Sequence, residues 1–176
     1  AQMEVHFGDY MLRSWREDDA AAVARYANNR KIWLNLRDAF LHPYALEDAK
    51  QFIAKALAMQ PETLFAIATA SEAIGSIGFH LGEDVHRFTA ELGYWLAEPF
   101  GRRGITTQAI SAVTDFAFEK FRLTRLFAVP YASNPASARV LEKNGFHFEG
   151  TLKCSAFKDG KVCDQLMYAK TGEVKS

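Results

Sequence analysis

Apolar residues recur along the chain at two spacings, and each spacing predicts one kind of element. In residues 49–57 they fall at i, i+3, i+4, i+7 and i+8, which is typical of one face of a helix. Elsewhere they form short continuous or alternating runs between turn residues, which is typical of strands. The runs that predict strands are 10–15, 63–69, 73–81, 88–96, 125–131, 147–157 and 162–170.

Three further helices are expected from their boundary residues. Asp18 is expected to cap the first, and a strongly amphipathic helix is expected to begin near Ile105. Asn134 stands at the cap of a shorter helix, Pro135 at its first position and Gly145 just past its end. The segment 28–44 mixes aromatic and charged residues without a clean period, so we expect an irregular connection there.

The order of these elements predicts a fold of the α/β (α+β) class. It reads β-α-α-β-β-β-α-β-α-β-β, which favours a single mixed sheet with helices on its faces. Residues 63–96 are expected to form a three-stranded antiparallel meander, and Asp159-Gly160 is expected to close a C-terminal hairpin. The chain has 176 residues and no repeat, low-complexity segment or linker, so we expect one domain.

Composition and charge narrow the classes of function. Hydrophobic residues make up 49% of the chain and charged residues 24%, which is typical of a globular protein. Lys plus Arg and Asp plus Glu both number 21, so no net field draws the chain to nucleic acid or to an anionic membrane. No leader pattern opens the sequence, and no apolar run reaches the about 18 residues of a membrane span. We therefore expect a soluble cytoplasmic protein and disfavour a nucleic-acid module.

The cysteines and histidines predict neither a disulfide nor a metal site. Cys154 and Cys163 would lie diagonally on the predicted hairpin, too far apart for an easy disulfide, so we expect reduced thiols. His80, His86 and His147 show no metal-ligand spacing with cysteines or carboxylates.

The stretch PFGRRGITTQA, residues 99–109, lies between a predicted strand and a predicted helix. A glycine-rich turn at such a place aims backbone N–H groups outward at the positive end of the helix dipole, which suits an anion. The side chains of Arg102, Arg103, Thr106 and Thr107 could add charge and donors. The stretch lacks the Lys-Ser/Thr of a P-loop and the G-x-G-x-x-G of a dinucleotide fold. On these residues alone, an anion site and a tight turn with solvated arginines both remain open.

Two stretches in this order carry a resemblance to a known family. YWLAEPFGRRGITTQAISAVTDFAF (94–118) and NPASARVLEKNGFHFEG (134–150) resemble the GCN5-related N-acetyltransferase (GNAT) superfamily, in particular its RimJ/RimL type of ribosomal-protein N-terminal acetyltransferases. The resemblance covers residues 8–170 and implies a single N-acetyltransferase domain. It implies a mostly antiparallel sheet with helices on both faces and a V-shaped cleft between two central strands. It also implies an acyltransferase that moves an acetyl group from acetyl-CoA to a primary amine.

The same resemblance implies which residues bind the coenzyme. The backbone of the 99–109 turn holds the pyrophosphate, the strand before it pairs with the pantetheine arm, and an asparagine side chain hydrogen-bonds that arm. The residues at these places are Trp95, Leu96, Ala97, Arg102, Arg103, Gly104, Ile105, Thr106, Thr107 and Asn134.

Acetyl transfer to an amine requires that the ammonium lose a proton and that the leaving thiolate gain one. Many superfamily members place an acid tyrosine seven residues after the asparagine, where Leu141 stands here. RimL-type enzymes have a serine three residues after it, here Ser137, which we expect to protonate or hydrogen-bond the sulfur; an ordinary helix position is the alternative. Ala156 replaces their hairpin glutamate. Glu91, a charge inside an apolar strand, is therefore the expected general base, with a solvent-facing strand residue as the alternative.

The acceptor site is expected from the irregular 28–44 segment and the closing hairpin, although a connection with aromatics packed on the sheet is equally open. Its candidate lining residues are Asn29, Arg30, Trp33, Asn35, Arg37 and Tyr44. The first expected acceptor is a protein or peptide N-terminus, such as that of a ribosomal protein, and the second is a polyamine or amino sugar. A non-catalytic acyl-CoA-binding regulatory domain is the alternative from another class. A monomer and a homodimer are both compatible with the sequence.

Overall fold

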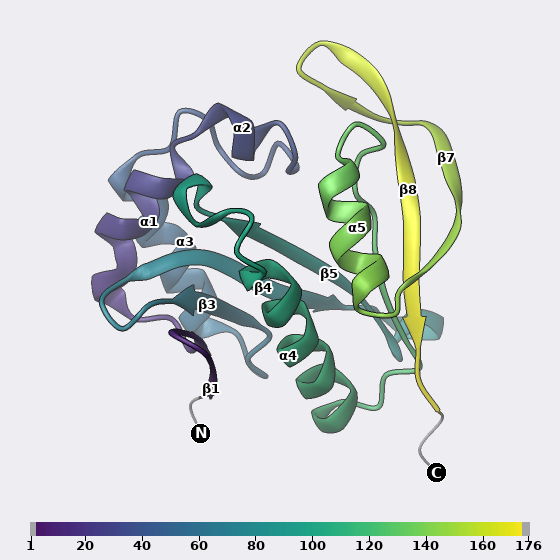
Figure 1. Cartoon of the computed structure of the whole chain (residues 1–176), viewed down its shortest axis with the longest axis horizontal. Helices are drawn as coiled ribbons and strands as arrows, with labels where there is room; N and C mark the ends of the chain where they lie inside the picture. The colour runs from purple at the N-terminus through teal and green to yellow at the C-terminus, as the bar shows by residue number, and fades with distance from the viewer. Residues whose placement is uncertain (1–2, 174–176) are drawn as a thin grey trace. The chain divides into compact units, whose positions relative to one another are not determined.

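Figure 1 shows a computed structural model of the chain, which describes residues 3–173. Its α-helices are α1 (Ala20–Ala27), α2 (Arg30–Trp33), α3 (Leu46–Ala58), α4 (Ile105–Lys120) and α5 (Pro135–Lys143). Three short 3-10 helices are η1 (Glu17–Asp19), η2 (Asp84–His86) and η3 (Glu98–Phe100). The chain forms two compact units: the first runs up to Gly78 and adds Tyr94–Ala109, and the second takes Phe79–Gly93 and the chain from Ile110 onward.

The strands form one mixed sheet, as the element order predicts. They are β1 (Glu4–Phe7), β2 (Tyr10–Arg13), β3 (Leu64–Ala68), β4 (Ala73–Leu81), β5 (Thr89–Leu96), β6 (Arg125–Ala128), β7 (His147–Lys158) and β8 (Lys161–Thr171). Their order is β1-β2-β3-β4-β5-β6-β8-β7. β5 and β6 are parallel, which requires a long crossover, and α4 supplies it. The pairs β1–β2, β2–β3, β3–β4, β6–β8 and β7–β8 are antiparallel.

Both faces of the sheet are covered at β3. Phe65, Ala66, Ile67 and Ala68 are all buried in a row. Since successive strand residues point to opposite faces, an unbroken buried run means that neither face meets water. The prediction of helices on the sheet faces is consistent with this pattern.

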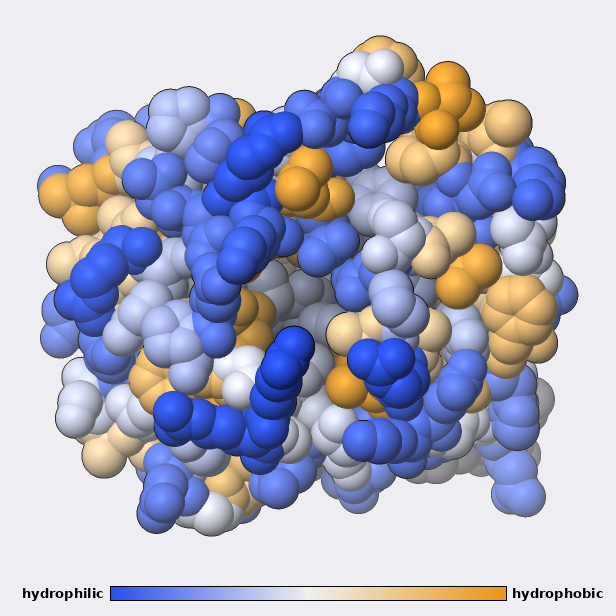
Figure 2. Space-filling view, turned by 45° about the horizontal axis from the view of Figure 1, so that its top comes forward, coloured by the Kyte–Doolittle hydropathy of each residue, from blue (hydrophilic) through white to orange (hydrophobic). Residues whose placement is uncertain are grey.

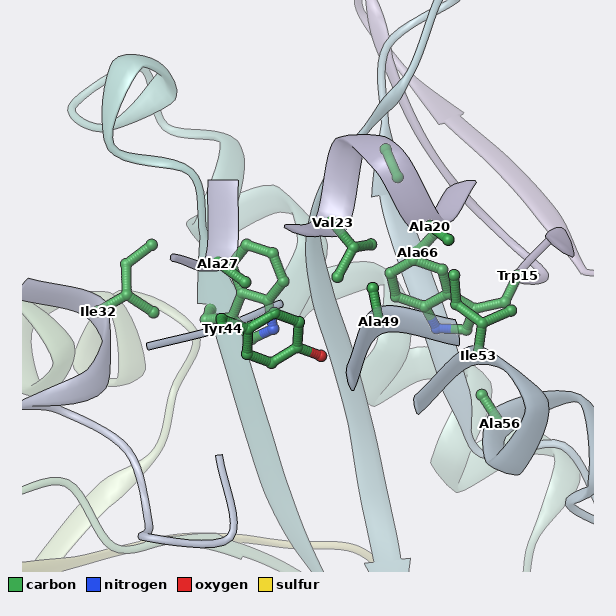
Figure 3. Close-up of a cluster of buried hydrophobic side chains, with 12 residues drawn as sticks. Trp15, Ala20, Val23, Ala27, Ile32, Tyr44, Ala49, Ile53, Ala56 and Ala66 are labelled. Carbon is green, nitrogen blue, oxygen red and sulfur yellow. The ribbon is translucent and has the colours of Figure 1, made fainter. Parts of the chain in front are cut away.

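In the first unit, helices α1 and α3 pack against each other over the sheet (Figure 3). Val23 and Ala27 from α1 and Ala49 and Ile53 from α3 lie in one buried cluster. The cluster continues to Trp15, whose ring meets that of Phe52 edge to face at 5.3 Å, and its other members are Ala20, Ile32, Tyr44, Ala56, Ala66, Ala73 and Trp95. The apolar spacing in the sequence therefore correctly predicts the buried face of α3, except at Leu57, which is exposed.

The start of α1 differs from the sequence prediction. Asp18 is exposed, whereas Asp19 is 5% exposed and accepts the backbone N–H of Arg16 at 2.8 Å. Both carboxylate oxygens of Asp19 also accept hydrogen bonds of 2.8 Å from the guanidinium of the buried Arg13. Asp19, not Asp18, therefore fixes the start of the helix, because its carboxylate also neutralises the buried guanidinium of Arg13 on β2.

In the second unit, α5 lies against the long β7–β8 hairpin. The hydroxyl of Tyr168 on β8 donates to Glu142 at 2.7 Å, and the ammonium of Lys170 donates to the backbone oxygen of Asn144 at 3.0 Å. Gly145 follows the helix with a φ of 79°, as expected for a residue just past a helix end. These contacts fix the helix whose capping residue is Asn134.

The β7–β8 hairpin closes over Asp159 and Gly160, as predicted, with φ of 53° and 75°. Its ladder is interrupted between Leu152 and Ala156, where residues 153–155 of β7 lie opposite a single residue of β8. Cys154, inside this bulge, has a φ of 54°. Cys154 is exposed, Cys163 is half-buried, and both are free cysteines.

Besides the three 3-10 helices, one strand and one helix of the described residues were not expected from the sequence. β1 is short and mostly exposed, so it carries no apolar run, and α2 is only one turn long inside the aperiodic 28–44 segment. Figure 2 shows one face of the surface, on which hydrophilic residues dominate and apolar residues lie in separate small groups. Within residues 3–173, the helices are all too short or too polar to cross a membrane.

Candidate functional site

The connection from β5 to α4 is anchored to the first unit at its beginning. The backbone N–H of Ala97 donates to the backbone oxygen of Ile74 on β4 at 2.7 Å. Three residues later, the ring of Phe100 meets the rings of Tyr10 and Tyr26 edge to face, at 6.5 and 6.1 Å. The turn that follows therefore starts from a fixed point.

Two left-handed residues then bend the chain into α4. Gly101 is extended, Arg102 has a φ of 64° and Gly104 has a φ of 75°. The helix begins at Ile105, which is 2% exposed, and the N–H of Gln108 makes a helical bond to the oxygen of Gly104 at 3.2 Å. The N-terminal turn of a helix carries the positive end of the helix dipole, and a left-handed turn just before it is a backbone conformation that can bind an anion.

The place that a side chain would take at Gly104 is open. A Cβ added to Gly104 would meet no atom within 4 Å. Arg102 and Arg103 are exposed, and the guanidinium of Arg103 lies over the Phe100 ring at 5.4 Å. Thr106 and Thr107 are half-buried in the first helical turn. The turn can therefore receive an anion at its backbone, with arginine charge nearby.

The three residues predicted to contact the coenzyme at the end of β5 and just after it differ in their orientation. Trp95 is 9% exposed, and its ring packs against Phe40 at 5.9 Å in the first-unit core. The N–H of Ala97 is bonded to β4. Since successive residues of a strand direct their backbone groups to opposite sides, the N–H and C=O of Leu96 point away from β4. Of the three, Leu96 is therefore the residue whose backbone groups are directed away from β4, and Trp95 contributes packing.

Glu91 lies on the other half of β5, in the second unit. It is half-buried, between the buried Ala90 and Leu92, and it stands opposite Phe127 in the parallel β5–β6 ladder. By alternation its side chain leaves the sheet on the face opposite to those two neighbours. The structure thus gives a carboxylate that is neither in the core nor fully solvated.

Asn134 acts as the cap of α5, as its position in the sequence predicts. Its Oδ1 accepts the backbone N–H of Ser137 at 3.4 Å. The cap uses only Oδ1, so the amide nitrogen of the side chain is not committed to it. Both residues are half-buried, whereas Leu141, where many superfamily members have a tyrosine, is fully buried in the core.

The 28–44 segment contains the six candidate acceptor residues, and they are not equivalent. Tyr44 is 7% exposed and packs on Phe40 at 5.1 Å, and its burial raises the pKa of the phenol to about 12, with the charge of Asp48 adding to the effect. Its ring is therefore part of the core beneath the segment. Arg37 is exposed, and the guanidinium of Arg30 lies over the Trp33 ring at 5.4 Å.

Asn29 and Asn35 use their side chains to hold the segment together. The Oδ1 of Asn29 accepts the backbone N–H of Lys31 at 2.9 Å and caps α2, while its Nδ2 donates to Glu98 at 2.7 Å. The Nδ2 of Asn35 donates to the backbone oxygen of Lys31 at 3.3 Å. The Nζ of Lys31 also donates to Glu98, at 2.9 Å.

Glu98 is a residue that sequence reasoning missed. Hydrogen bonds from Lys31 and Asn29 and the charge of Lys31 hold its pKa below the usual value, so it is ionised near neutral pH. Its one signal in the sequence was an acidic residue followed by proline, just after the strand and just before the glycine turn. Within residues 3–173, no group of three or more His, Cys, Asp or Glu is placed to hold a metal ion.

Comparison with known proteins identifies the family. The model described as "Acetyltransferase (GNAT) domain" matches residues 10–147. The chain belongs to the GNAT acetyltransferase family. The match includes the β5–α4 turn and α5, the two stretches in which the sequence resembles the superfamily.

Sequence relatives of this GNAT chain include named acetyltransferases. It is 36% identical over 107 residues to the ribosomal-protein-serine acetyltransferase of Escherichia coli, which covers 61% of this chain and 59% of the relative. It is 38% identical over 98 residues to the uncharacterized N-acetyltransferase YoaA of Bacillus subtilis, covering 56% and 55%. The chain spans a little over half the length of these curated relatives.

Solved structures share the fold over nearly the whole chain. The ribosomal-protein-S5-alanine acetyltransferase of Vibrio fischeri has a TM-score of 0.86 at 22% identity and covers 99% of this chain and 100% of its own. Mycobacterium smegmatis RimJ in complex with a CoA disulfide has a TM-score of 0.84 at 25% identity, covering 97% and 86%. RimL, a ribosomal L7/L12 alpha-N-protein acetyltransferase solved with coenzyme A, has a TM-score of 0.84 at 24% identity, covering 96% and 98%.

Proposed function

We propose that this protein transfers an acetyl group from acetyl-CoA to a primary amine, and that residues 8–170 form the acetyltransferase domain. The observation that carries the proposal is the left-handed turn at Arg102 and Gly104, which leads directly into the N-terminus of α4, the end of a helix that favours an anion. Membership of the GNAT family supports the same reaction.

The turn fits the pyrophosphate of the coenzyme. The backbone from Arg103 to Thr107 would donate N–H bonds to phosphate oxygens, and the arginine charges at the rim would favour the anion. The absence of a side chain at Gly104 leaves this approach open. The backbone of Leu96 would pair with the pantetheine arm, and the amide of Asn134 would hydrogen-bond it.

The chemical step needs a base and a donor, and we assign both to the second unit. Glu91 would take a proton from the acceptor ammonium, directly or through water, so that the free amine can attack the thioester carbonyl carbon. As the C–S bond breaks, the hydroxyl of Ser137 would give a proton or a hydrogen bond to the sulfur. The half-buried positions of both side chains support these roles, since each can be reached from solvent without being fully hydrated.

The acceptor we favour is the N-terminal α-amino group of a protein or peptide. The support is the naming of the Escherichia coli relative and of the RimL structure, both of which are ribosomal-protein acetyltransferases. A small amine, such as a polyamine or an amino sugar, is the second candidate. The segment 28–44, with Arg30, Trp33 and Arg37 on its exposed or half-buried side, is the proposed acceptor wall.

One experiment separates these proposals. The protein would be incubated with acetyl-CoA and, in turn, peptides with free N-termini, the same peptides with blocked N-termini, a polyamine and an amino sugar. Free thiol release and acceptor mass would be measured. Transfer to free but not blocked N-termini supports the proposal, and transfer to the small amines alone would replace the acceptor. Acetyl-CoA binding without thiol release for any amine would show a non-catalytic acyl-CoA-binding domain.

A further inference from the structure

The structure assigns Glu98 a positioning role: its carboxylate fastens α2, and with it the proposed acceptor wall, to the start of the coenzyme-binding turn. This inference rests on the proposed function, because it takes the 28–44 segment to face the acceptor. Glu98 touches neither substrate in the proposal. It acts through the place that it gives to Asn29 and Lys31.

Glu98 itself stands on a rigid support. The residue before it, Ala97, is fully buried and bonded through its backbone to β4. Two residues after it, the Phe100 ring is held between Tyr10 and Tyr26. The backbone of Glu98 also closes the 3-10 turn, since its oxygen accepts the N–H of Gly101 at 3.1 Å. The carboxylate therefore has a fixed origin.

Helix α2, in contrast, needs outside support. It has four residues, Arg30–Trp33, and a single helical turn is unstable by itself because nucleation costs more than one turn of bonds returns. Ile32 anchors its inner side in the first-unit core. On the outer side, two hydrogen bonds join α2 to the start of the coenzyme-binding turn, and both end on the carboxylate of Glu98. One comes from the cap residue Asn29, and the other comes from Lys31, the second residue of the helix.

The arrangement makes Asn29 a bridge with two separate functions. Its oxygen caps α2, and its amide nitrogen bonds to Glu98. Serine can perform the first function but not the second, because it caps helices about as well as asparagine and has no amide donor. Asn29→Ser therefore removes the contact between Asn29 and Glu98 while it keeps the cap and the contact between Lys31 and Glu98.

The experiment compares Glu98→Ala, Asn29→Ser and the double variant with the full wild-type chain. Glu119→Ala, which removes an exposed carboxylate on α4, is the matched control. For each protein, KM for a short peptide with a free N-terminal amine, Kd for acetyl-CoA and hydrogen exchange of the amides in residues 30–36 are measured. Glu98→Gln is added because its amide oxygen can still accept from Asn29.

Each single change is expected to raise the peptide KM by about threefold to tenfold, as for a charge-assisted contact at an exposed site. The Kd for acetyl-CoA should stay within about twofold of the wild-type value, and exchange in residues 30–36 should accelerate. The double variant should be no worse than Glu98→Ala, because the one contact that Asn29→Ser removes ends on Glu98 and is already lost in that variant. Glu98→Gln should lie nearer to the wild type than Glu98→Ala.

Three results would overturn the inference: effects that multiply in the double variant, an equal loss of acetyl-CoA affinity, or unchanged exchange in residues 30–36. A wild-type chain that transfers no acetyl group to any peptide would instead refute the proposed function. The exchange measurement would still decide whether Glu98 holds α2.

Discussion

Replacing Gly104 with valine should strongly weaken coenzyme binding at a modest cost to the stability of the fold. The residue has a φ of 75°, and a side chain in the left-handed region costs about 1–2 kcal/mol. No steric cost from the protein adds to this at the Cβ, because that atom would meet nothing within 4 Å. For a chain of this size, the loss corresponds to a fall in Tm of about 2–8 °C.

The loss of binding should be much larger than the loss of stability. A hydrogen bond to a charged group contributes about 1.5–3 kcal/mol, and a branched side chain in front of the turn would displace the pyrophosphate from at least two N–H groups. Two such bonds amount to about 3–6 kcal/mol, or about 10²- to 10⁴-fold in Kd. Arg102→Ala, at an exposed arginine, should weaken acetyl-CoA binding by less than about tenfold.

Calorimetric titration with acetyl-CoA measures the Kd of the Gly104→Val and Arg102→Ala variants. Thermal unfolding measures the stability that the valine at Gly104 costs. The matched control is Gly160→Val in the β7–β8 turn, where φ is also 75° and a Cβ also meets nothing within 4 Å. The control should lose the same stability and keep its acetyl-CoA affinity. The reasoning fails if Gly104→Val binds acetyl-CoA like the control, or if Arg102→Ala is the more damaging change.

Three further predictions follow from the other sites. Asn134→Ala should cost about 1 kcal/mol of stability as a lost cap, and it should also raise the KM for acetyl-CoA. Ser137→Ala should lower kcat. If steady-state kinetics give wild-type values for both variants, the two residues have structural roles only. Glu91→Gln should lower kcat by about 10²- to 10⁴-fold without changing the Kd for acetyl-CoA, and a normal kcat would place the base elsewhere. Asp19→Ala should destabilise the chain by about 3–5 kcal/mol in urea unfolding, because it strands the buried charge of Arg13; a loss below about 1 kcal/mol would contradict the buried ion pair.

Much of the fold could be predicted from the sequence where one physical signal dominates a segment. The apolar period of α3, the Asn134 cap and the Asp159-Gly160 turn each specify their element locally, and each is found in the structure. β1 and α2 could not be found in this way, because both are short and are held mainly by tertiary contacts. Asp18 and Asp19 are equally good caps by residue type, and only the buried Arg13 on another element decides between them.

For the candidate site, the sequence predicted the turn before α4 but not the contacts that anchor this turn to the rest of the unit. Glycine spacing predicts a bend, and the left-handed Arg102 and Gly104 confirm one. The anchoring contacts of Phe100 and Glu98 join residues that are about 70 to 90 positions apart, and spacing rules do not reach that far. For the same reason, the sequence leaves open whether Tyr44 lines the acceptor site or packs on the sheet, and the structure buries it in the core.

The bulge in β7 has a consequence for the protein's behaviour at high concentration. β7 is the last strand of the sheet and is twelve residues long. Near the tip of the hairpin, Phe157 on β7 is 67% exposed, and Val162 on the facing strand β8 is 62% exposed. A long regular edge with exposed apolar side chains is a template on which further chains can add strands. The three residues at 153–155 break the row of unpaired N–H and C=O groups and bend the edge, so that a second copy finds no straight ladder to extend. The irregular stretch thus protects the sheet from polymerising through its own border.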